Sequence, residues 1–151
     1  MTAAIASTTE DMGTTGLGLD IGAQRIGVAA ANLSVRFAGP LVTLDDPASF
    51  LNDIIELCRQ REAAWIVAGR PRGMDGQETE QTRRVLAFGA ELEARLASAG
   101  LHIPLYWIDE ALTSHKAEAE LQNRRKPYQK GDVDALAATF ILEDFLKEHH
   151  V

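Results

Sequence analysis

The 151-residue chain is poor in cysteine, in positive charge and in long hydrophobic runs. Its one cysteine, Cys58, excludes an intrachain disulfide and is typical of a reducing cytoplasm, where we expect the protein to work. No apolar stretch is long enough to cross a bilayer, so we expect no membrane contact. Lysine and arginine number 15 against 22 acidic residues, which gives a net charge of −7. That balance excludes nonspecific binding of nucleic acid over the whole surface.

The remaining composition predicts one globular domain. Hydrophobic residues make up 46% and charged residues 25%, and the length is sufficient for a hydrophobic core. Residues 1–15 are small and polar and lack the basic start and apolar stretch of a signal peptide, so we expect a disordered leader before a domain at 16–151. Cys58 falls in step with Ile54 and Ile55 on a helical pattern, which favours a buried core thiol over a catalytic one.

Hydrophobic periodicity predicts an α/β fold. The expected strands are 16–21, 25–31, one within 34–44, 65–69 and 105–108. The expected helices are 46–61, 78–99, 113–123 and 133–147. The links between the first three strands are short enough to require an antiparallel meander. The helix and strand alternation that follows predicts a mixed sheet with helices on both faces.

Acidic residues stand at the ends of three separate apolar segments. Asp20 ends the first strand, Asp109 and Glu110 follow the last strand, and Asp134 lies in the final helix. A charge beside a core is costly unless it is compensated, so three such places suggest a shared cation site. Carboxylate oxygens are the ligands that Mg²⁺ prefers. Asp109 and Glu110 point to opposite faces of a strand, and periodicity alone does not choose between them.

The final helix separates its two nearest acids. At 100° per residue, Asp134 lies about 20° from Ile141 and Phe145 and so belongs to the apolar stripe. Asp132 precedes the expected helix and is the natural N-cap. Asp20, by strand alternation, points away from the face of its apolar neighbours, which is consistent either with a turn cap or with a metal ligand.

Positive charge is gathered in two places despite the acidic total. One holds Arg70 and Arg72, followed by Arg83 and Arg84 in the next helix. The other, residues 122–130, carries four cations and no acid: Arg124, Arg125, Lys126 and Lys130. Such patches let an acidic protein hold a polyanion locally, so we expect them to bind the phosphate backbone of a nucleic acid.

Four motifs in order make the chain resemble the YqgF/RuvX family over nearly everything after Gly16. Asp20-Ile-Gly-Ala-Gln-Arg-Ile-Gly-Val-Ala resembles the family's opening Asp-x-Gly-x-x-Arg-Ile-Gly-Val-Ala. Gly69-Arg-Pro-Arg-Gly-Met-Asp-Gly resembles its glycine–proline loop, Asp109-Glu-Ala-Leu-Thr-Ser is similar to Asp-Glu-Arg-Leu-Thr-Ser/Thr, and Val133-Asp-Ala-Leu-Ala-Ala is similar to its closing helix. Members are named both as Holliday junction resolvases and as pre-16S ribosomal RNA nucleases.

The resemblance implies a ribonuclease H-like fold, with a five-stranded mixed sheet whose first three strands are antiparallel. It selects Glu110 over Asp109 and Asp134 over Asp132, so that Asp20, Glu110 and Asp134 are the implied catalytic ligands of Mg²⁺ or Mn²⁺. Arg25, in the opening motif, joins the residues expected to bind nucleic acid. Three positions depart from the family pattern: Ala111 replaces the usual arginine, and Ile21 and Gln24 replace an aromatic residue and a lysine.

The leading functional hypothesis is a two-metal nuclease acting on phosphodiester bonds, with processing of the 5′ end of pre-16S rRNA as its task. A Holliday junction resolvase is the first alternative, and it predicts a homodimer because symmetric cutting needs two sites. A catalytically weak nucleic-acid-binding module is a second, which the acidic charge and Ala111 allow. A phosphotransferase of the actin or sugar-kinase type shares the Asp-x-Gly motif but needs two such domains, and this chain has room for one.

Overall fold

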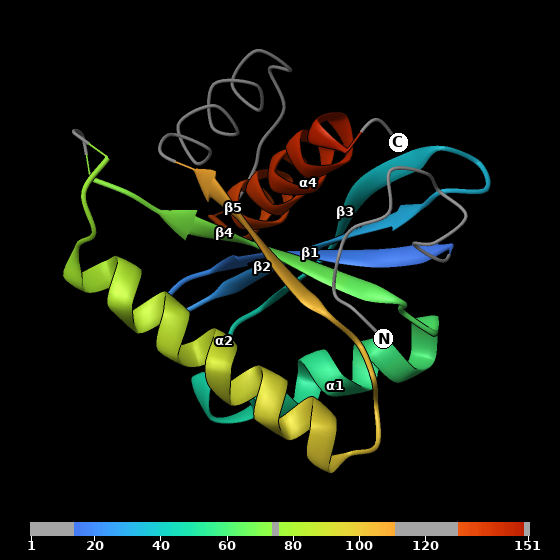
Figure 1. The fold of residues 1–151 in the computed structure, drawn as a ribbon, viewed down its shortest axis with the longest axis horizontal. Coiled ribbons are helices and arrows are strands. Elements are labelled where there is room, and N and C mark those ends of the chain that lie inside the picture. The colour runs from blue at the N-terminus through green and yellow to red at the C-terminus, as the bar shows by residue number, and fades with distance from the viewer. Residues whose placement is uncertain (1–13, 74–75, 111–129, 150–151) are drawn as a thin grey trace.

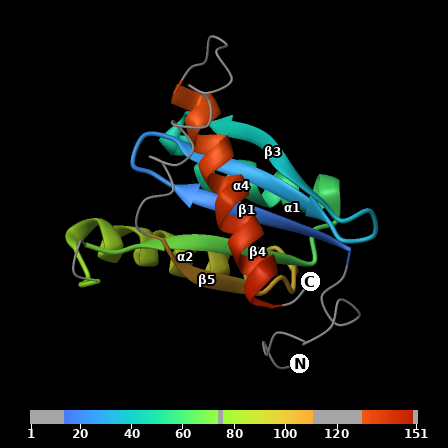
Figure 2. The same ribbon diagram turned by 90° about the horizontal axis from the view of Figure 1, so that it is seen from above.

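The computed structural model describes residues 14–73, 76–110 and 130–149, and its centre is a five-stranded sheet (Figure 1). The strands are β1 (Thr15–Ile21), β2 (Ile26–Asn32), β3 (Phe37–Leu44), β4 (Trp65–Pro71) and β5 (Leu105–Glu110). The helices are the 3₁₀ turn η2 (Pro47–Ser49), α1 (Phe50–Arg61), α2 (Glu80–Ser98) and α4 (Lys130–Glu148). Helices α1 and α2 cover one face of the sheet and α4 crosses the other (Figure 2).

The strand order is β3-β2-β1-β4-β5. Strand β2 pairs antiparallel with both β1 and β3, whereas β4 runs parallel to β1 and β5. The predicted mixed sheet, with three antiparallel strands first and helices on both faces, is therefore confirmed. Strands β1, β4 and β5 all end at one edge of the sheet, where ligands collect in open α/β sheets.

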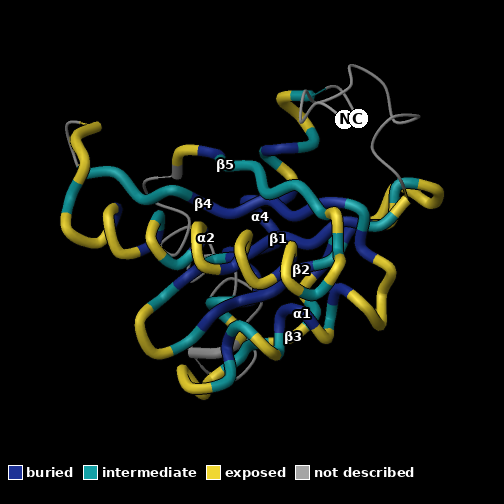
Figure 3. Tube along the Cα trace, turned by 60° about the horizontal axis from the view of Figure 1, so that its bottom comes forward, coloured by how far each residue is buried: buried dark blue, intermediate teal, exposed yellow. Residues whose placement is uncertain are grey.

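Two hydrophobic cores lie on the two faces of the sheet. Leu17 and Leu19 of β1 pack toward α1 and α2, while Trp65 and Val67 of β4 pack toward α4. Figure 3 shows the central strands buried, with exposed residues along α1 and α2, while α4 is buried throughout residues 135–142. This alternation assigns each strand residue to one face, which fixes where the candidate site residues lie.

The first helical segment follows its predicted start and buries the only cysteine. The side chain of Asp46 accepts a hydrogen bond from the Ala48 backbone N–H at 3.1 Å and so caps η2.

Cys58 is buried on α1, and desolvation raises the pKa of its thiol to about 11. A thiol that remains protonated at neutral pH is a poor nucleophile, so the prediction of a core cysteine is confirmed.

Helix α4 begins earlier than predicted, and one prediction is wrong. Asp132 lies within its first turn rather than at its N-cap, because the helix is already formed at Lys130 and continues through Gly131.

Strand β1 begins at Thr15, the last residue of the expected leader, and residues 1–13 lie outside the described part. The predicted helix 113–123 also lies outside it. No helix in the described ranges is both long enough and apolar enough to cross a membrane.

Candidate active site

Two of the predicted carboxylate residues, Asp20 and Asp134, both lie next to Gly27 of β2. Asp20 pairs with Gly27 in the antiparallel register of β1 and β2. A Cβ atom at position 27 would lie 1.9 Å from the carbonyl oxygen of Asp134, so only glycine allows α4 this close to the strand. Paired residues of an antiparallel ladder have Cα atoms about 5 Å apart. The start of α4 is therefore held one strand away from Asp20.

Asp20 lies on the face of the sheet that α4 covers. Its neighbours Leu19 and Ile21 belong to the core beneath α1 and α2. Gly18, two residues away and therefore on the same face as Asp20, lies against α4, since a Cβ there would be 3.0 Å from the Ala138 carbonyl oxygen. The prediction that Asp20 points away from its apolar neighbours agrees with this packing, and Asp20 and Asp134 share one face.

Arg25 forms an ion pair with Asp134. Its Nε atom lies 2.5 Å from Oδ2 of Asp134, and the two side chains are 37% and 18% exposed. The turn between β1 and β2 holds Arg25 there, because the Gly22 N–H donates to the Arg25 carbonyl at 2.9 Å. A residue expected to contact nucleic acid thus contacts a candidate metal ligand. The charge of Asp134 is compensated by a cation, as its partly buried position requires.

The parallel register of β4 and β5 gives Asp109 and Glu110 different partners on β4. Arg70 pairs with Asp109, and Pro71 pairs with Glu110. Position 109 shares the parity of Trp107, which packs toward α2, whereas position 110 shares the parity of Ile108, which packs toward α4. Only the backbone of Glu110 is described. Its register position is on the face of Asp20 and Asp134, at the edge where β1 also ends.

Asp109 instead pairs with two arginines on the face of the sheet away from α4. Its Oδ1 atom accepts hydrogen bonds from Nε of Arg70 at 2.7 Å and from Nε of Arg72 at 3.4 Å. The hydrogen bond from Arg70 is the main cause of a lowered pKa at Asp109, and the same bond raises the pKa of Arg70. Sequence reasoning identified both arginines but missed Asp109 as their partner. No local pattern reports this partnership, because Arg70 and Asp109 are 39 positions apart.

Threonine contacts hold the end of β4, which carries Arg70 and is followed directly by Arg72. The hydroxyl of Thr82 donates to the Pro71 carbonyl at 2.6 Å, and Thr82 is fully buried. Thr79 and Thr82 form a reciprocal capping box at the start of α2. The end of β4 is therefore tied to the first turn of α2, which limits the backbone freedom of the arginine pair.

The donor set on the α4 face suits a hard divalent cation. Carboxylate oxygens from Asp20 and Asp134 are ligands of the kind that Mg²⁺ and Mn²⁺ take, and the site already attracts a guanidinium. The side chains that the structure describes include no complete group of three acidic, histidine or cysteine ligands. Of the remaining predicted cations, Arg124, Arg125 and Lys126 lie outside the described residues, and Lys130 begins α4.

Comparison with known proteins identifies the family. The family model described as "RuvX: Holliday junction resolvase" matches residues 14–148. A "Putative pre-16S rRNA nuclease" of Crocosphaera subtropica is 39% identical over 137 residues, covering 87% of this chain and 92% of that protein. A protein of Rippkaea orientalis with the same description is 38% identical over 135 residues, covering 86% and 93%.

A solved structure supports the same fold. RuvC of Thermus thermophilus, determined in complex with a Holliday junction substrate, matches with a TM-score of 0.57 at 15% identity. The match covers 90% of this chain and 96% of that one, and it confirms the predicted ribonuclease H-like arrangement. Because the family model matches residues 14–148, the chain belongs to the RuvX family.

Proposed function

We propose that the chain is a metal-dependent nuclease that processes the 5′ end of pre-16S rRNA. The observation that carries the proposal is the contact of Gly27 with the backbone of Asp134, which sets two carboxylates on one face beside the carboxyl edge of the sheet. Two relatives described as pre-16S rRNA nucleases, each covered over more than nine-tenths of its length, support the RNA substrate. A cytoplasmic location is part of the proposal.

Asp20, Glu110 and Asp134 are the residues that would hold Mg²⁺ or Mn²⁺. When bound, the ions supply a nucleophilic water and stabilise the leaving oxygen in an in-line displacement. The chain's own task would be to hold these three ligand residues, which belong to β1, β5 and α4. Arg25 compensates the charge of Asp134, and its guanidinium is suited to bind a substrate phosphate once that charge is otherwise compensated.

Arg70 of β4 and Arg72, which follows it, are the proposed contacts to the phosphate backbone of the substrate. Arg70 and Arg72 both pair with Asp109, and Arg72 also lies 3.9 Å from Glu78; the guanidinium groups are partly exposed, so a substrate phosphate can replace these carboxylate partners. Their strand runs beside β5, and Pro71 between them is in register with Glu110. Arg124, Arg125, Lys126 and Lys130 complete the proposed set as backbone contacts without base specificity.

A Holliday junction resolvase is the second candidate. The description of the matching family model favours it. This function needs two active sites that act together on a four-way junction, and it therefore includes a homodimer.

The deciding experiment offers both substrates to one preparation. Purified protein with Mg²⁺ or Mn²⁺ is incubated with a labelled structured RNA carrying a 5′ extension and with a labelled four-way DNA junction. We expect metal-dependent cleavage of the RNA, abolished by chelation and by Asp20→Asn. Symmetric cleavage of the junction alone would favour the resolvase. Binding without cleavage of either substrate would contradict a nuclease and support a nucleic-acid-binding module.

A further inference from the structure

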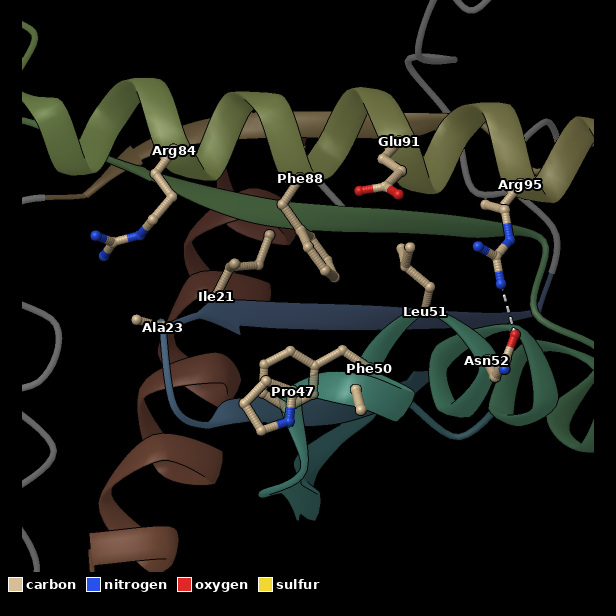
Figure 4. A pocket seen from close by; sticks show the side chains of 12 residues that line it. Ile21, Ala23, Pro47, Phe50, Leu51, Asn52, Arg84, Phe88, Glu91 and Arg95 are labelled. Atoms are coloured by element: carbon tan, nitrogen blue, oxygen red, sulfur yellow. Dashed lines mark hydrogen bonds between the residues drawn. The ribbon is translucent and has the colours of Figure 1, made fainter.

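A cavity lies on the opposite face of the sheet from Asp134, between the β1–β2 turn, α1 and α2 (Figure 4). Its volume is about 440 Å³, within the range of small-ligand sites. Phe50 and Leu51 of α1, Phe88 of α2 and Ile21 of β1 give it an apolar wall. The Phe88 ring meets Phe50 edge-on at a centroid distance of 6.3 Å, so aromatic surface borders the cavity.

The charged groups of the cavity differ between its two ends. Arg84 lies at the end near Ala23, while Glu91 and Arg95 lie further along α2 (Figure 4). Arg95 is engaged, since it donates to Oδ1 of Asn52 at 2.7 Å. Among the described residues, no carboxylate lies within ion-pair distance of Arg84. An anionic group is therefore favoured at the Arg84 end and disfavoured near Glu91.

The Arg84 end adjoins the candidate active site along the chain. Ile21 and Gly22 line the cavity and directly follow Asp20. The same turn carries Arg25, whose carbonyl accepts the Gly22 N–H. A chain of nucleotides that leaves the carboxylate site around this turn would reach Arg84 next. Sequence reasoning singled out Arg84 as part of a basic cluster, and the nuclease proposal gave it no role.

We propose that this cavity binds one nucleotide, with the base against the Phe88 ring and the phosphate on Arg84. A planar guanidinium matches phosphate oxygens, and an aromatic ring stacks on any base. Glu91 sets the direction, because it repels phosphate and accepts hydrogen bonds from an amino group on the base. The inference rests on the proposed nuclease function only in assigning the nucleotide to the substrate strand. A free nucleotide has the same chemistry.

Binding is measured without divalent cations, so the test does not depend on the metal site. Adenosine monophosphate and ribose 5-phosphate are titrated by NMR into wild type, Arg84→Ala, Phe88→Leu and the matched control Arg83→Ala. Arg83 is the neighbouring exposed arginine on α2 and does not line the cavity. Loss of stacking or of the phosphate contact should each raise the Kd of adenosine monophosphate about tenfold. Ribose 5-phosphate should bind at least about tenfold more weakly than adenosine monophosphate.

A second arm identifies the source of the nucleotide. A labelled single-stranded RNA of about ten nucleotides is titrated into the same variants, with thermal unfolding to verify that Phe88→Leu is folded. Parallel losses for RNA and adenosine monophosphate assign the site to the substrate strand, and loss for adenosine monophosphate alone assigns it to a free nucleotide. Equal effects of Arg83→Ala and Arg84→Ala, or ribose 5-phosphate binding as tightly as adenosine monophosphate, would overturn the proposal. Asp20→Asn should bind nucleotide normally, so failed cleavage and a failed nucleotide site remain distinguishable.

Discussion

Within residues 14–73, 76–110 and 130–149, two aspartates pair with arginine, and they lie on opposite faces of the sheet. Asp134 pairs with Arg25 on the α4 face and has an 18% exposed side chain. Asp109 pairs with Arg70 and Arg72 on the other face and has a 55% exposed side chain. The chemical pairing is the same, but the surroundings differ in burial and in the balance of charge.

The charge balance gives the two groups opposite preferences. Asp134 has a second acid, Asp20, one strand away, so two carboxylates share the face with Arg25. Asp109 faces two guanidinium groups, and Glu78 lies 3.9 Å from one of them, Arg72. The first group carries excess negative charge and attracts a cation, whereas the second presents two partly exposed guanidinium groups that can bind a phosphate. Aspartate–arginine pairs at the same end of the sheet can therefore have different functions, according to the charges around them.

The largest expected effect is on catalysis by the acidic group. Asp20→Asn, Glu110→Gln and Asp134→Asn should each lower metal-dependent cleavage at least about a hundredfold, because each removes a proposed metal ligand. Asp109→Asn is the matched control and should change the rate far less. Initial rates on labelled substrate measure this, with circular dichroism as the check on folding. Equal losses for Asp109→Asn and Asp134→Asn would remove the distinction between the two groups.

The next effect concerns the glycine that brings Asp134 to the sheet. Gly27→Ala should destabilise the fold by about 2 kcal/mol or more, because its Cβ would meet the backbone of α4. Gly100→Ala is the control: its φ of +77° is strained for alanine, but open space surrounds it, so we expect about 1 kcal/mol. Urea unfolding measures both. A cost at Gly27 no larger than at Gly100 would show that α4 is not seated against β2 as described.

A smaller effect tests the competition between arginine and metal. Arg25→Ala should strengthen Mn²⁺ binding about threefold to tenfold, since the guanidinium no longer compensates Asp134. The rise in melting temperature at a fixed Mn²⁺ concentration reports this gain. Arg70→Ala, which removes the same charge from the other group, should leave that rise unchanged. A smaller rise in Arg25→Ala than in wild type would mean that Arg25 supports the cation site.

The smallest effect is on polyanion binding by the basic group. Asp109→Asn should tighten nucleic-acid binding a few-fold, because it removes the carboxylate shared by Arg70 and Arg72 and leaves only Glu78 beside Arg72. Replacing both arginines by alanine should flatten the slope of log affinity against log salt by about 0.7 to 0.9 per lost phosphate contact. Fluorescence anisotropy over a salt series gives both numbers. An unchanged slope would place the polyanion elsewhere, with residues 122–130 the next segment to test.

Sequence reasoning succeeded where the determining interactions are local. Alternation along β1 assigned Asp20 to the face opposite Leu19, and helical periodicity placed Cys58 in the core, because both patterns depend on neighbours within one element. It failed at the start of α4. The local sequence Gly131-Asp132 favours Asp132 as a helix N-cap. The helix nevertheless includes Gly131, so Asp132 is not its N-cap.

Contacts between distant segments lay beyond the sequence. Arg25 and Asp134 are 109 positions apart, and no local pattern reports their pairing. The choice between Asp109 and Glu110 required the register of β5 against β4, since alternation says only that the two differ. The family resemblance selected Glu110 without a physical reason. The register shows that Asp109 lies with Arg70 on the face away from α4, which supports the proposed choice of Glu110.

The central claim is that the carboxylates on the α4 face, and not Asp109, form the divalent-cation site. Calorimetric titration of Mn²⁺ into wild type, Asp134→Asn and Asp109→Asn, without substrate, tests it most directly. Wild type and Asp109→Asn should bind alike, and Asp134→Asn should bind at least about tenfold more weakly. Unchanged Mn²⁺ affinity in Asp134→Asn, or a loss confined to Asp109→Asn, would contradict the account.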